Sequence, residues 1–464
     1  MDRSSKIALM EVIILCGFIC AVSFHYVAGV AKHGEYPYST FLYRPDLQFS
    51  DFTETVFHSS TPHAKLENAA YSSGPAYGPF LLAVVGALFQ HKGLHVHTAL
   101  VWFLGTFAVA YFVICYKYLK TDCCSETIRR CVIFSFCSYS FLYALDRANF
   151  EVWSVLAVAA AFGAYSARGS FSKVKPWLAM TSMALALSFK PFGIFFLPAF
   201  MAQRTKRETA ITIIMAVLLT LCGLVYLGPH IGTTLHDMLN NIEATNQRYV
   251  IGKDGMVNGS GLYPMLKLSC RWYYGNYHAS WVEPLHFYFC ISAVISIICL
   301  FLYVLLIERE AWRQFAICAL AVNLLPTIAF PYRLLYVNIA MMAFANAAVK
   351  NKNDRLYSIL FAVVVMPLGY LFFDPVELSE TTLIEPLAMI ALTAMIVWDG
   401  YAARRAALAA APADTPVQAS FPSPFAGTPA YSTGALREQP LEQSRAAMEH
   451  KSGLPLTAES DNAG

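Results

Sequence analysis

The chain has 464 residues, of which 57% are hydrophobic and only 14% are charged. This composition excludes an ordinary soluble globular domain, in which about a quarter of the residues are charged. The formal net charge of +3 comes from short clusters of Lys and Arg between apolar runs, so we expect no basic face for nucleic acid. Apolar runs long enough to cross about 30 Å of hydrocarbon recur along most of the sequence. The sequence therefore predicts an all-α polytopic membrane protein.

The first 30 residues combine Arg3 and Lys6 with a long apolar stretch that ends near Ala28 and Ala31. A signal peptide has the same order of features, but its apolar region is shorter. We therefore expect an uncleaved first membrane span.

Basic clusters between the apolar runs predict the orientation, because Lys and Arg are retained in cytoplasmic loops. The clusters are Arg3/Lys6, Lys117/Lys120/Arg129/Arg130, Arg168/Lys173/Lys175, Arg204/Lys206/Arg207, Arg309/Arg313, Lys350/Lys352/Arg355 and Arg404/Arg405. All clusters lie inside if residues 78–91 lie on the outer membrane surface and residues 176–203 form a hairpin with Lys190 and Pro191 near its tip. Both termini are then cytoplasmic. The predicted crossings number about 12: 8–30, 97–116, 130–145, 150–167, 176–188, 192–203, 209–228, 286–307, 314–330, 334–349, 356–373 and 383–400. In the alternative topology residues 78–91 cross the membrane, residues 176–203 form one long helix, and the basic clusters at 117–130 and 168–175 lie outside.

Two polar extracytoplasmic loops, residues 31–96 and 229–285, interrupt the apolar domain, which we predict to cover residues 1–402. Residues 403–464 are rich in Ala, Pro, Ser and Glu and contain few large aliphatic side chains. Such a composition cannot bury enough apolar surface to fold. We therefore predict a disordered cytoplasmic tail.

Polar residues from four separate segments are expected at the outer membrane level. They are Asp51 and Glu54, the run Asp146-Arg147-Ala148-Asn149-Phe150-Glu151, Lys190, and Arg333 in FPYRLLYV. Ionisable groups at the edge of a bilayer mark functional sites. The cations could hold a lipid phosphate and stabilise it as a leaving group, and a carboxylate could take the proton of an attacking hydroxyl.

The order of these segments resembles glycosyltransferase family 87. An Asp-Phe pair in the first outer loop is followed by AYGPFLLAVVGALF, DRANFEVWSVLAV and ALALSFKPFGIFFLPAF. The resemblance covers roughly residues 8–350. It implies the C-type glycosyltransferase fold, a helical bundle in which part of the first outer loop lies as a juxtamembrane helix on the outer membrane surface. It also implies a polyprenyl-phosphate-linked sugar as donor and a catalytic Asp in that loop.

Carried over by position, Asp51 matches the family's catalytic acid and Lys190 matches the lysine before its Pro-rich apolar run. Tyr77 and Pro79 match its Tyr-Pro-Pro element, although Gly78 stands where the first of those prolines is found. The resemblance thus implies Asp51 as the general base of an inverting transfer.

The remaining site residues are assigned around this acid. Donor phosphate binding is predicted for Lys190, Arg333 and Arg147. Substrate binding is predicted for Tyr77, Glu54 and Asn149.

Each of these residues also has a simpler structural interpretation. Asp51 precedes Thr-Glu-Thr and could cap a short loop helix. Lys190 stands at a helix break and could reach the lipid headgroups. Arg147 could simply form an ion pair with Asp146 or Glu151 and take no part in donor binding. If Asp51 is not the base, Glu54 and Asp46 are the next acids to consider.

The sequence HKGLHVH places His91, His95 and His97 close together, but no acid or cysteine stands beside them. Most of the 12 cysteines lie inside apolar runs, and no CxxC spacing occurs. These patterns indicate neither a metal site nor a disulfide framework. We therefore expect no metal and no other cofactor.

The sequence favours a multi-pass enzyme of the inner or plasma membrane that transfers a sugar, with mannose as one candidate. The expected donor is a polyprenyl-phosphate sugar, the acceptor is a lipid or glycan on the extracytoplasmic side, and the surroundings are membrane lipids. A polytopic secondary transporter is the alternative, but it should show paired halves with interrupted helices and midplane charges. A lipid-binding membrane protein is a third interpretation, and it would need no buried acid.

Overall fold

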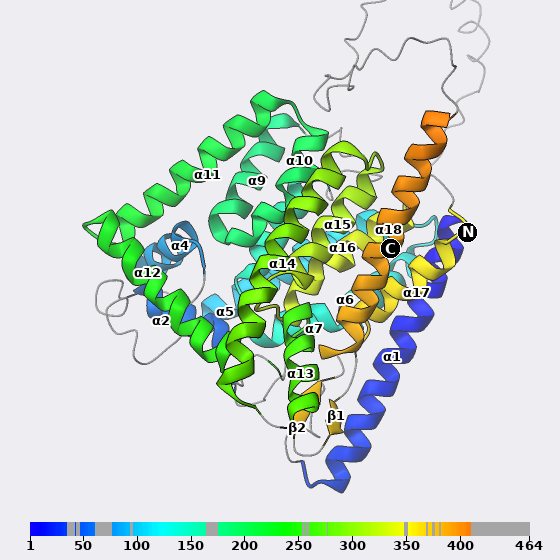
Figure 1. Cartoon of the computed structure of the whole chain (residues 1–464), viewed down its shortest axis with the longest axis horizontal. Helices are drawn as coiled ribbons and strands as arrows, with labels where there is room; N and C mark the ends of the chain where they lie inside the picture. Colours follow the sequence, from blue (N-terminus) through cyan, green and yellow to red (C-terminus); the bar gives the residue numbers. More distant parts are fainter. Residues whose placement is uncertain are drawn as a thin grey trace, which may run out of the picture. The chain divides into compact units, whose positions relative to one another are not determined.

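The described part of the protein is helical apart from one antiparallel β-hairpin, β1 (Tyr370–Phe373) with β2 (Val376–Ser379) (Figure 1). A computed structural model describes residues 1–34, 42, 47–60, 77–92, 96–163, 175–252, 256, 259–275, 277–347, 351–367, 370–373, 376–379 and 382–409. All of them belong to one compact unit, Met1–Phe425. The predicted helical class is confirmed, and the hairpin adds to it.

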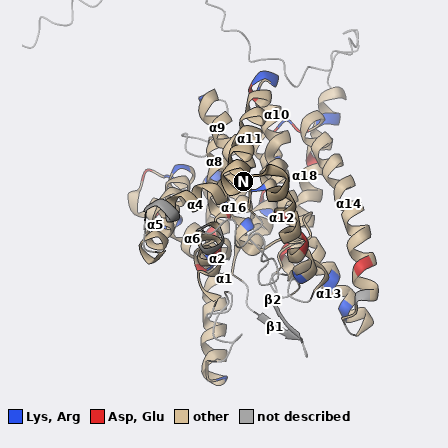
Figure 2. Cartoon of the chain, turned by 90° about the vertical axis from the view of Figure 1, so that its left-hand side faces the viewer, with Lys and Arg blue, Asp and Glu red and all other residues tan. Residues whose placement is uncertain are grey.

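Five of the described helices are long and apolar enough to cross a membrane. They are α1 (Arg3–Ala31), α5 (Val96–Leu119), α11 (Lys206–Leu227), α14 (Ala279–Leu306) and α18 (Ile384–Ala409). A sixth span results if α6 (Cys124–Phe136) and α7 (Tyr139–Arg147), bent by 60° at their junction, count as one. Figure 2 shows that these long helices carry little charge along most of their length. They identify a membrane protein, but the predicted number of about 12 crossings is not confirmed.

The other predicted crossings correspond to shorter helices. These are α8 (Glu151–Ala161), α9 (Pro176–Phe189), η4 (Pro191–Phe196), α10 (Leu197–Gln203), α15 (Ala311–Leu324), α16 (Leu334–Ala345) and α17 (Asp354–Val365), with the short helix η6 (Pro331–Arg333) between α15 and α16. At 1.5 Å of rise per residue, none of them alone reaches across about 30 Å of hydrocarbon. α15 and α16 are buried along almost their whole length. These two helices therefore form the protein core.

The predicted helix break at Lys190 and Pro191 is confirmed. α9 ends at Phe189, Lys190 is extended with φ −154° and ψ 138°, and η4 begins at Pro191. Proline has no N–H and disfavours helical backbone in the residue before it. Gly193 lies so close to the end of α9 that a Cβ there would meet the carbonyl oxygen of Ala186 at 2.8 Å. The chain therefore turns sharply after Lys190 and packs against α9.

The two predicted outer loops contain helices of their own. The first holds α2 (Ser50–Ser60) and α4 (Pro79–Lys92), and α4 packs against both α2 and α11. The second holds α12 (Ile231–Thr245), the π-helix η5 (Asn246–Ile251) and α13 (Leu262–Tyr274). α4 corresponds to the predicted juxtamembrane helix at 78–91, and its place on the membrane surface stays a prediction.

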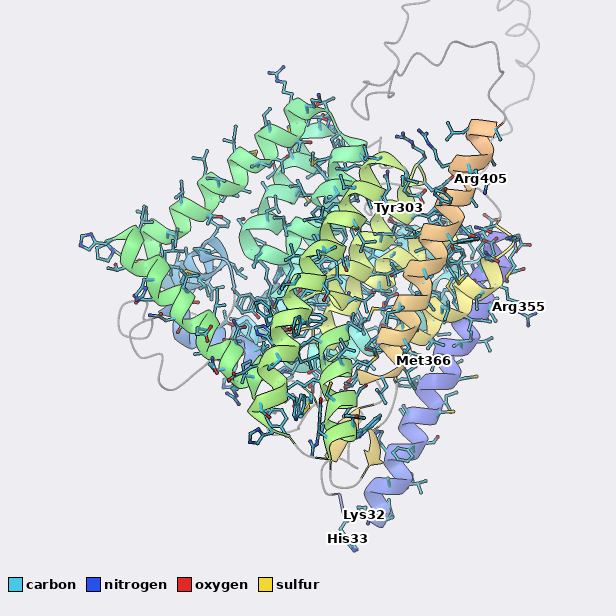
Figure 3. All side chains as sticks on the ribbon, viewed as in Figure 1. Lys32, His33, Tyr303, Arg355, Met366 and Arg405 are labelled. Atoms are coloured by element: carbon cyan, nitrogen blue, oxygen red, sulfur yellow. The ribbon has the colours of Figure 1, made fainter. Side chains whose placement is uncertain are left out.

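The C-terminal helix α18 continues to Ala409, past the predicted domain boundary at residue 402. The predicted disorder of the remaining tail concerns residues 410–464, which lie outside the described residues, as does Asp46. Arg355 and Arg405, from two of the clusters predicted to be cytoplasmic, lie toward the same end of the molecule as the N-terminus, whereas Lys32 lies at the far end of α1 (Figure 3).

The predicted orientation can be tested on Cys123 and Cys124, which are exposed beside the start of α6. Since this segment belongs to a basic cluster expected in the cytoplasm, a membrane-impermeant maleimide should label these thiols only after cells are permeabilised. The Cys123→Ala/Cys124→Ala variant supplies the background signal. Labelling of the two cysteines in intact cells would show that this segment lies outside, and the predicted orientation would be wrong.

The start of α4 is fixed by a close approach to the end of α9. The Gly78 N–H donates to the carbonyl oxygen of Phe189 at 2.7 Å, and a Cβ at position 78 would collide with the carbonyl oxygen of Ser188. A proline at this position would also lose the hydrogen bond to Phe189. The close contact with the end of α9 therefore explains why residue 78 is glycine and not proline in this chain.

Gly78→Ala should destabilise the protein by about 1–3 kcal/mol, because the backbone of α9 has to move to make room. Gly105→Ala in α5 is the matched control, since its Cβ would point into open space. We expect the thermal unfolding temperature in detergent to fall for Gly78→Ala and to stay level or rise for Gly105→Ala. Equal unfolding temperatures would argue against the close approach.

Candidate active site

Asp51 lies in the first turn of α2, and both of its carboxylate oxygens are bound by residues far along the chain. Arg147 Nη2 donates to Oδ1 at 2.5 Å, and Asn149 Nδ2 donates to Oδ2 at 2.6 Å. Arg147 Nη1 also donates to the carbonyl oxygen of Leu47 at 2.8 Å. These bonds join α2 to the junction of α7 and α8, which a simple helix cap would not do.

The junction of α7 and α8 is shaped by Ala148, which ends α7 in the left-handed conformation with φ 49° and ψ 43°. This conformation is uncommon for a residue with a Cβ and persists only where the surroundings enforce it. Ala148 is fully buried, and its two neighbours, Arg147 and Asn149, both bind Asp51. The turn therefore places two side chains on one carboxylate.

Glu151 forms a second, buried centre at the start of α8. Lys190 Nζ lies 2.6 Å from Oε2, and Arg333 Nε lies 3.2 Å from Oε1. All three side chains are buried. Lys190 comes from the break between α9 and η4, and Arg333 comes from η6, so three separate elements converge on one carboxylate.

Aromatic rings surround the two cations of this centre. Lys190 Nζ lies 4.8 Å from the ring centre of Tyr77 and 5.5 Å from that of Tyr332, and Arg333 Cζ lies 3.6 Å from that of Phe192. Ring faces attract cations, more strongly where water is excluded. A buried charge without a partner is costly, so the rings and Glu151 together make it possible for both cations to be buried.

The two centres belong to one network. Asn149 donates to Asp51, and its Oδ1 accepts the backbone N–H of Glu151 at 2.8 Å. Within this network three cations face two carboxylates. The balance of charge is therefore positive, and the network could accept a further anion.

Two neighbours of Asp51 have shifted pKa values. Burial raises the pKa of the Glu54 carboxyl, and the charge of Asp51 raises it further, while Arg147 and Arg248 oppose the shift. Burial also raises the pKa of the Tyr77 hydroxyl well above its usual value. Tyr77 therefore keeps its proton at neutral pH and can donate a hydrogen bond.

Residues 76–259 match the model of glycosyltransferase family 87. This stretch of the chain resembles family 87. The matched stretch includes Tyr77, the α7–α8 junction and Lys190, whereas Asp51 and Arg333 lie on either side of it. No curated protein and no solved structure matches the chain. The match confirms the resemblance seen in the sequence and indicates a membrane glycosyltransferase.

The structure of the family 87-like chain brings the predicted site residues into one region. Hydrogen bonds or ion pairs join Asp51, Arg147 and Asn149 in one centre and place Lys190 and Arg333 in the other. Tyr77 lies against Lys190, and Glu54 lies within the electrostatic reach of Asp51. The roles that we predict for these residues in catalysis and binding remain predictions.

One structural alternative considered for Arg147 is not found, and the contacts of Glu151 were not predicted. Arg147 pairs with Asp51 instead of Asp146 or Glu151. Glu151 was considered only as a partner of Arg147, yet it binds Lys190 and Arg333. The sequence held one signal for these contacts, because Glu151 stands at the start of the apolar run VWSVLAV. A carboxylate on a buried helix needs cationic partners.

Among the described side chains, no group of three or more His, Cys, Asp or Glu residues is placed to hold a metal ion. His97 is exposed at the start of α5. The side chain of His91 and the whole of His95 lie outside the described part of the chain.

The pair of Glu151 with Lys190 can be tested with a double-mutant cycle. Glu151→Gln should cost about 3–5 kcal/mol, because it leaves two buried cations without their carboxylate. Lys190→Met should cost less, because Arg333 remains as a partner of Glu151. The double variant should cost less than the sum of the two by about 1 kcal/mol or more. The free energies would come from denaturant unfolding in detergent, and additive effects would argue against the pair.

The control for this cycle is a pair that is open to solvent on one side. Arg129 binds Glu11 at 2.8 Å, but the Arg129 side chain is 60% exposed. Glu11→Gln leaves only the exposed Arg129 without this partner, and water can hydrate its guanidinium. Glu11→Gln should therefore change the free energy of unfolding far less than Glu151→Gln.

Proposed function

We propose that the protein transfers a sugar from a polyprenyl-phosphate donor to a lipid or glycan acceptor at the extracytoplasmic face of the plasma membrane. Mannose is the first sugar to test. The observation that carries the proposal is the network in which Asp51 and two buried cations, Lys190 and Arg333, are held together by Asn149 and Glu151. The family 87-like match supports glycosyl transfer as the class of reaction.

Asp51 is proposed as the general base. Arg147 and Asn149 fix its orientation with one hydrogen bond on each oxygen, and each carboxylate oxygen retains a further lone pair for a proton. In the reaction the acceptor hydroxyl oxygen bonds to the anomeric carbon while the bond from that carbon to the phosphate oxygen breaks. The electron pair leaves with the phosphate and the hydroxyl proton goes to Asp51. This single displacement inverts the anomeric configuration.

Lys190 and Arg333 are proposed to stabilise the departing phosphate. A guanidinium carries five N–H donors and an ammonium carries three. The bonds to Glu151 and to the carbonyl oxygen of Ile328 use only some of them. Glu151 holds the cations in place before the donor arrives, so that they need not reorganise as charge develops. Tyr77, which keeps its proton, would donate a further hydrogen bond beside Lys190.

The alternative of a secondary transporter fits the described residues less well. A transporter needs charges near the midplane and two related halves with interrupted helices. Here Asp51, Arg147, Glu151, Lys190 and Arg333 form one network beside outer-loop residues. This arrangement favours chemistry at one membrane surface over passage through the membrane.

Asp51→Asn keeps the size of the side chain but cannot accept a proton at neutral pH. If Asp51 is the base, the variant should lower turnover by about 10²–10⁴-fold while the protein stays folded and still binds the donor. Turnover would be measured with synthetic short-chain prenyl-phosphate hexoses, beginning with the mannose compound, and a membrane lipid extract as acceptor.

Glu54→Gln is the matched comparison, because it removes the other acid of the same helix face. Since Glu54 is predicted to bind substrate and not to take the proton, this variant should raise KM and leave kcat within a few-fold of the parent. Well-folded Asp51→Asn protein with near-normal sugar transfer would refute the assignment. If Glu54→Gln instead abolished transfer, the base would be Glu54.

A further inference from the structure

α12 begins where a candidate membrane span ends. α11 runs from Lys206 to Leu227, a rise of about 33 Å at 1.5 Å per residue, which matches the thickness of the hydrocarbon core. Its N-terminal end carries a basic cluster predicted to be cytoplasmic, so Ile231 lies at the opposite membrane boundary. In Figure 1 α12 folds back from the end of α11 and runs toward α13 and α14. It has 15 residues and carries charge, so it does not cross the membrane.

α12 has three distinct faces. The first is an exposed apolar stripe formed by Ile231 (41%), Leu235 (46%), Leu239 (55%) and Ile242 (44%). Their spacing of four, four and three residues places them on one side of a helix. The second face packs against the protein through Thr234, Met238 and Asn241. The third face is polar and exposed, with His236, Asn240 and Glu243.

This division into protein, apolar and polar faces is typical of a helix that lies in a membrane interface. Leaving four aliphatic side chains in water would be unfavourable by about 25 cal/mol for each Å² of apolar surface. α11, which ends three residues before α12 begins, also exposes apolar side chains, namely Ile214, Val217, Leu218, Leu221 and Val225. Since α11 has the length of a membrane span, lipid is the phase expected to cover the apolar side chains of both helices.

We propose that α12 lies in the outer leaflet of the bilayer, with the stripe Ile231, Leu235, Leu239 and Ile242 buried among the acyl chains. α12 contains no Lys or Arg and carries two acids, Asp237 and Glu243. Its attachment therefore depends on the burial of apolar surface and not on anionic headgroups.

The position of α12 also affects the candidate active site. α12 continues directly into η5, whose Arg248 lies within electrostatic reach of Glu54. The ring of Tyr249 in η5 lies 5.8 Å from that of Phe330, which immediately precedes η6 and Arg333. A helix held in the leaflet thus fixes the height of the site near the level of lipid phosphates. This last consequence rests on the proposed function, whereas the position of α12 does not.

The turn after η5 is secured independently of lipid. Lys267 is fully buried, and its Nζ donates to the carbonyl oxygen of Val250 at 2.7 Å and to that of Gly252. A buried ammonium surrounded by carbonyl oxygens fixes the backbone that supplies them. η5 is therefore held at both ends, by α12 on one side and by α13 on the other.

The test is photocrosslinking with p-benzoylphenylalanine at single positions of the full chain in nanodiscs of phosphatidylcholine. Leu235 and Leu239 are the stripe positions, and His236 and Asn240, each one residue further along, are the matched controls. After irradiation, intact-mass spectrometry should find severalfold more phospholipid adduct at the stripe positions than at the controls. The yields should be the same when anionic phosphatidylglycerol is added.

Equal adduct yields at all four positions would overturn the proposal, as would a covalent dimer formed from the stripe positions. The unfolding temperature of each variant would be measured first, and Ile242 with Glu243 provides a second matched comparison if a variant does not fold. Crosslinking to lipid requires no sugar transfer, so its outcome is independent of whether the proposed function is correct.

Discussion

The arrangement of the site depends on the carboxylate of Glu151, because it neutralises two buried cations from different parts of the chain. Removing either charge from water costs several kcal/mol, and the attraction in a low-dielectric interior offsets this cost only when the geometry is good. The start of α8, the break after α9 and the turn η6 are therefore fixed relative to one another. Asn149 extends this constraint to Asp51 through the backbone of Glu151.

Such a network suits a reaction that creates charge on a leaving phosphate. The donors are in place before the substrate binds, so little reorganisation is needed as the transition state forms. The rings of Tyr77, Phe192 and Tyr332 keep water away from the cations and strengthen their electrostatic effect. The same burial explains why Lys190 does not simply extend to the lipid headgroups, as the sequence alone allowed.

Sequence reasoning succeeded where the cause is local. The break at Lys190 follows from Pro191, and the helical class follows from the length of the apolar runs. The pairing of Arg147 with Asp51 could not be predicted in this way, because it depends on a left-handed turn at Ala148. Alanine gives no signal for that conformation, which is imposed by packing around the junction of α7 and α8.

The predicted number of membrane crossings is not confirmed, for a related physical reason. A helix that is apolar on all sides can be surrounded either by lipid or by other helices, and hydropathy does not distinguish the two. The apolar sequences of α15 and α16 predict membrane spans, and in the structure both helices are surrounded by other parts of the protein. The convergence of the acids and cations could be predicted, because their segments were expected at one membrane level. The partner of each charge could not be predicted, because it depends on tertiary structure.

The short buried helices also constrain how the chain is inserted during synthesis. α15 carries Arg313, Gln314 and Asn323, and it is too short to partition into a bilayer as an independent segment. Its neighbours include α14, made before it, and α18, made after it. α15 can therefore reach its final surroundings only after α18 has been synthesised, and a chain that stops before residue 384 would leave the side of α15 that α18 covers exposed.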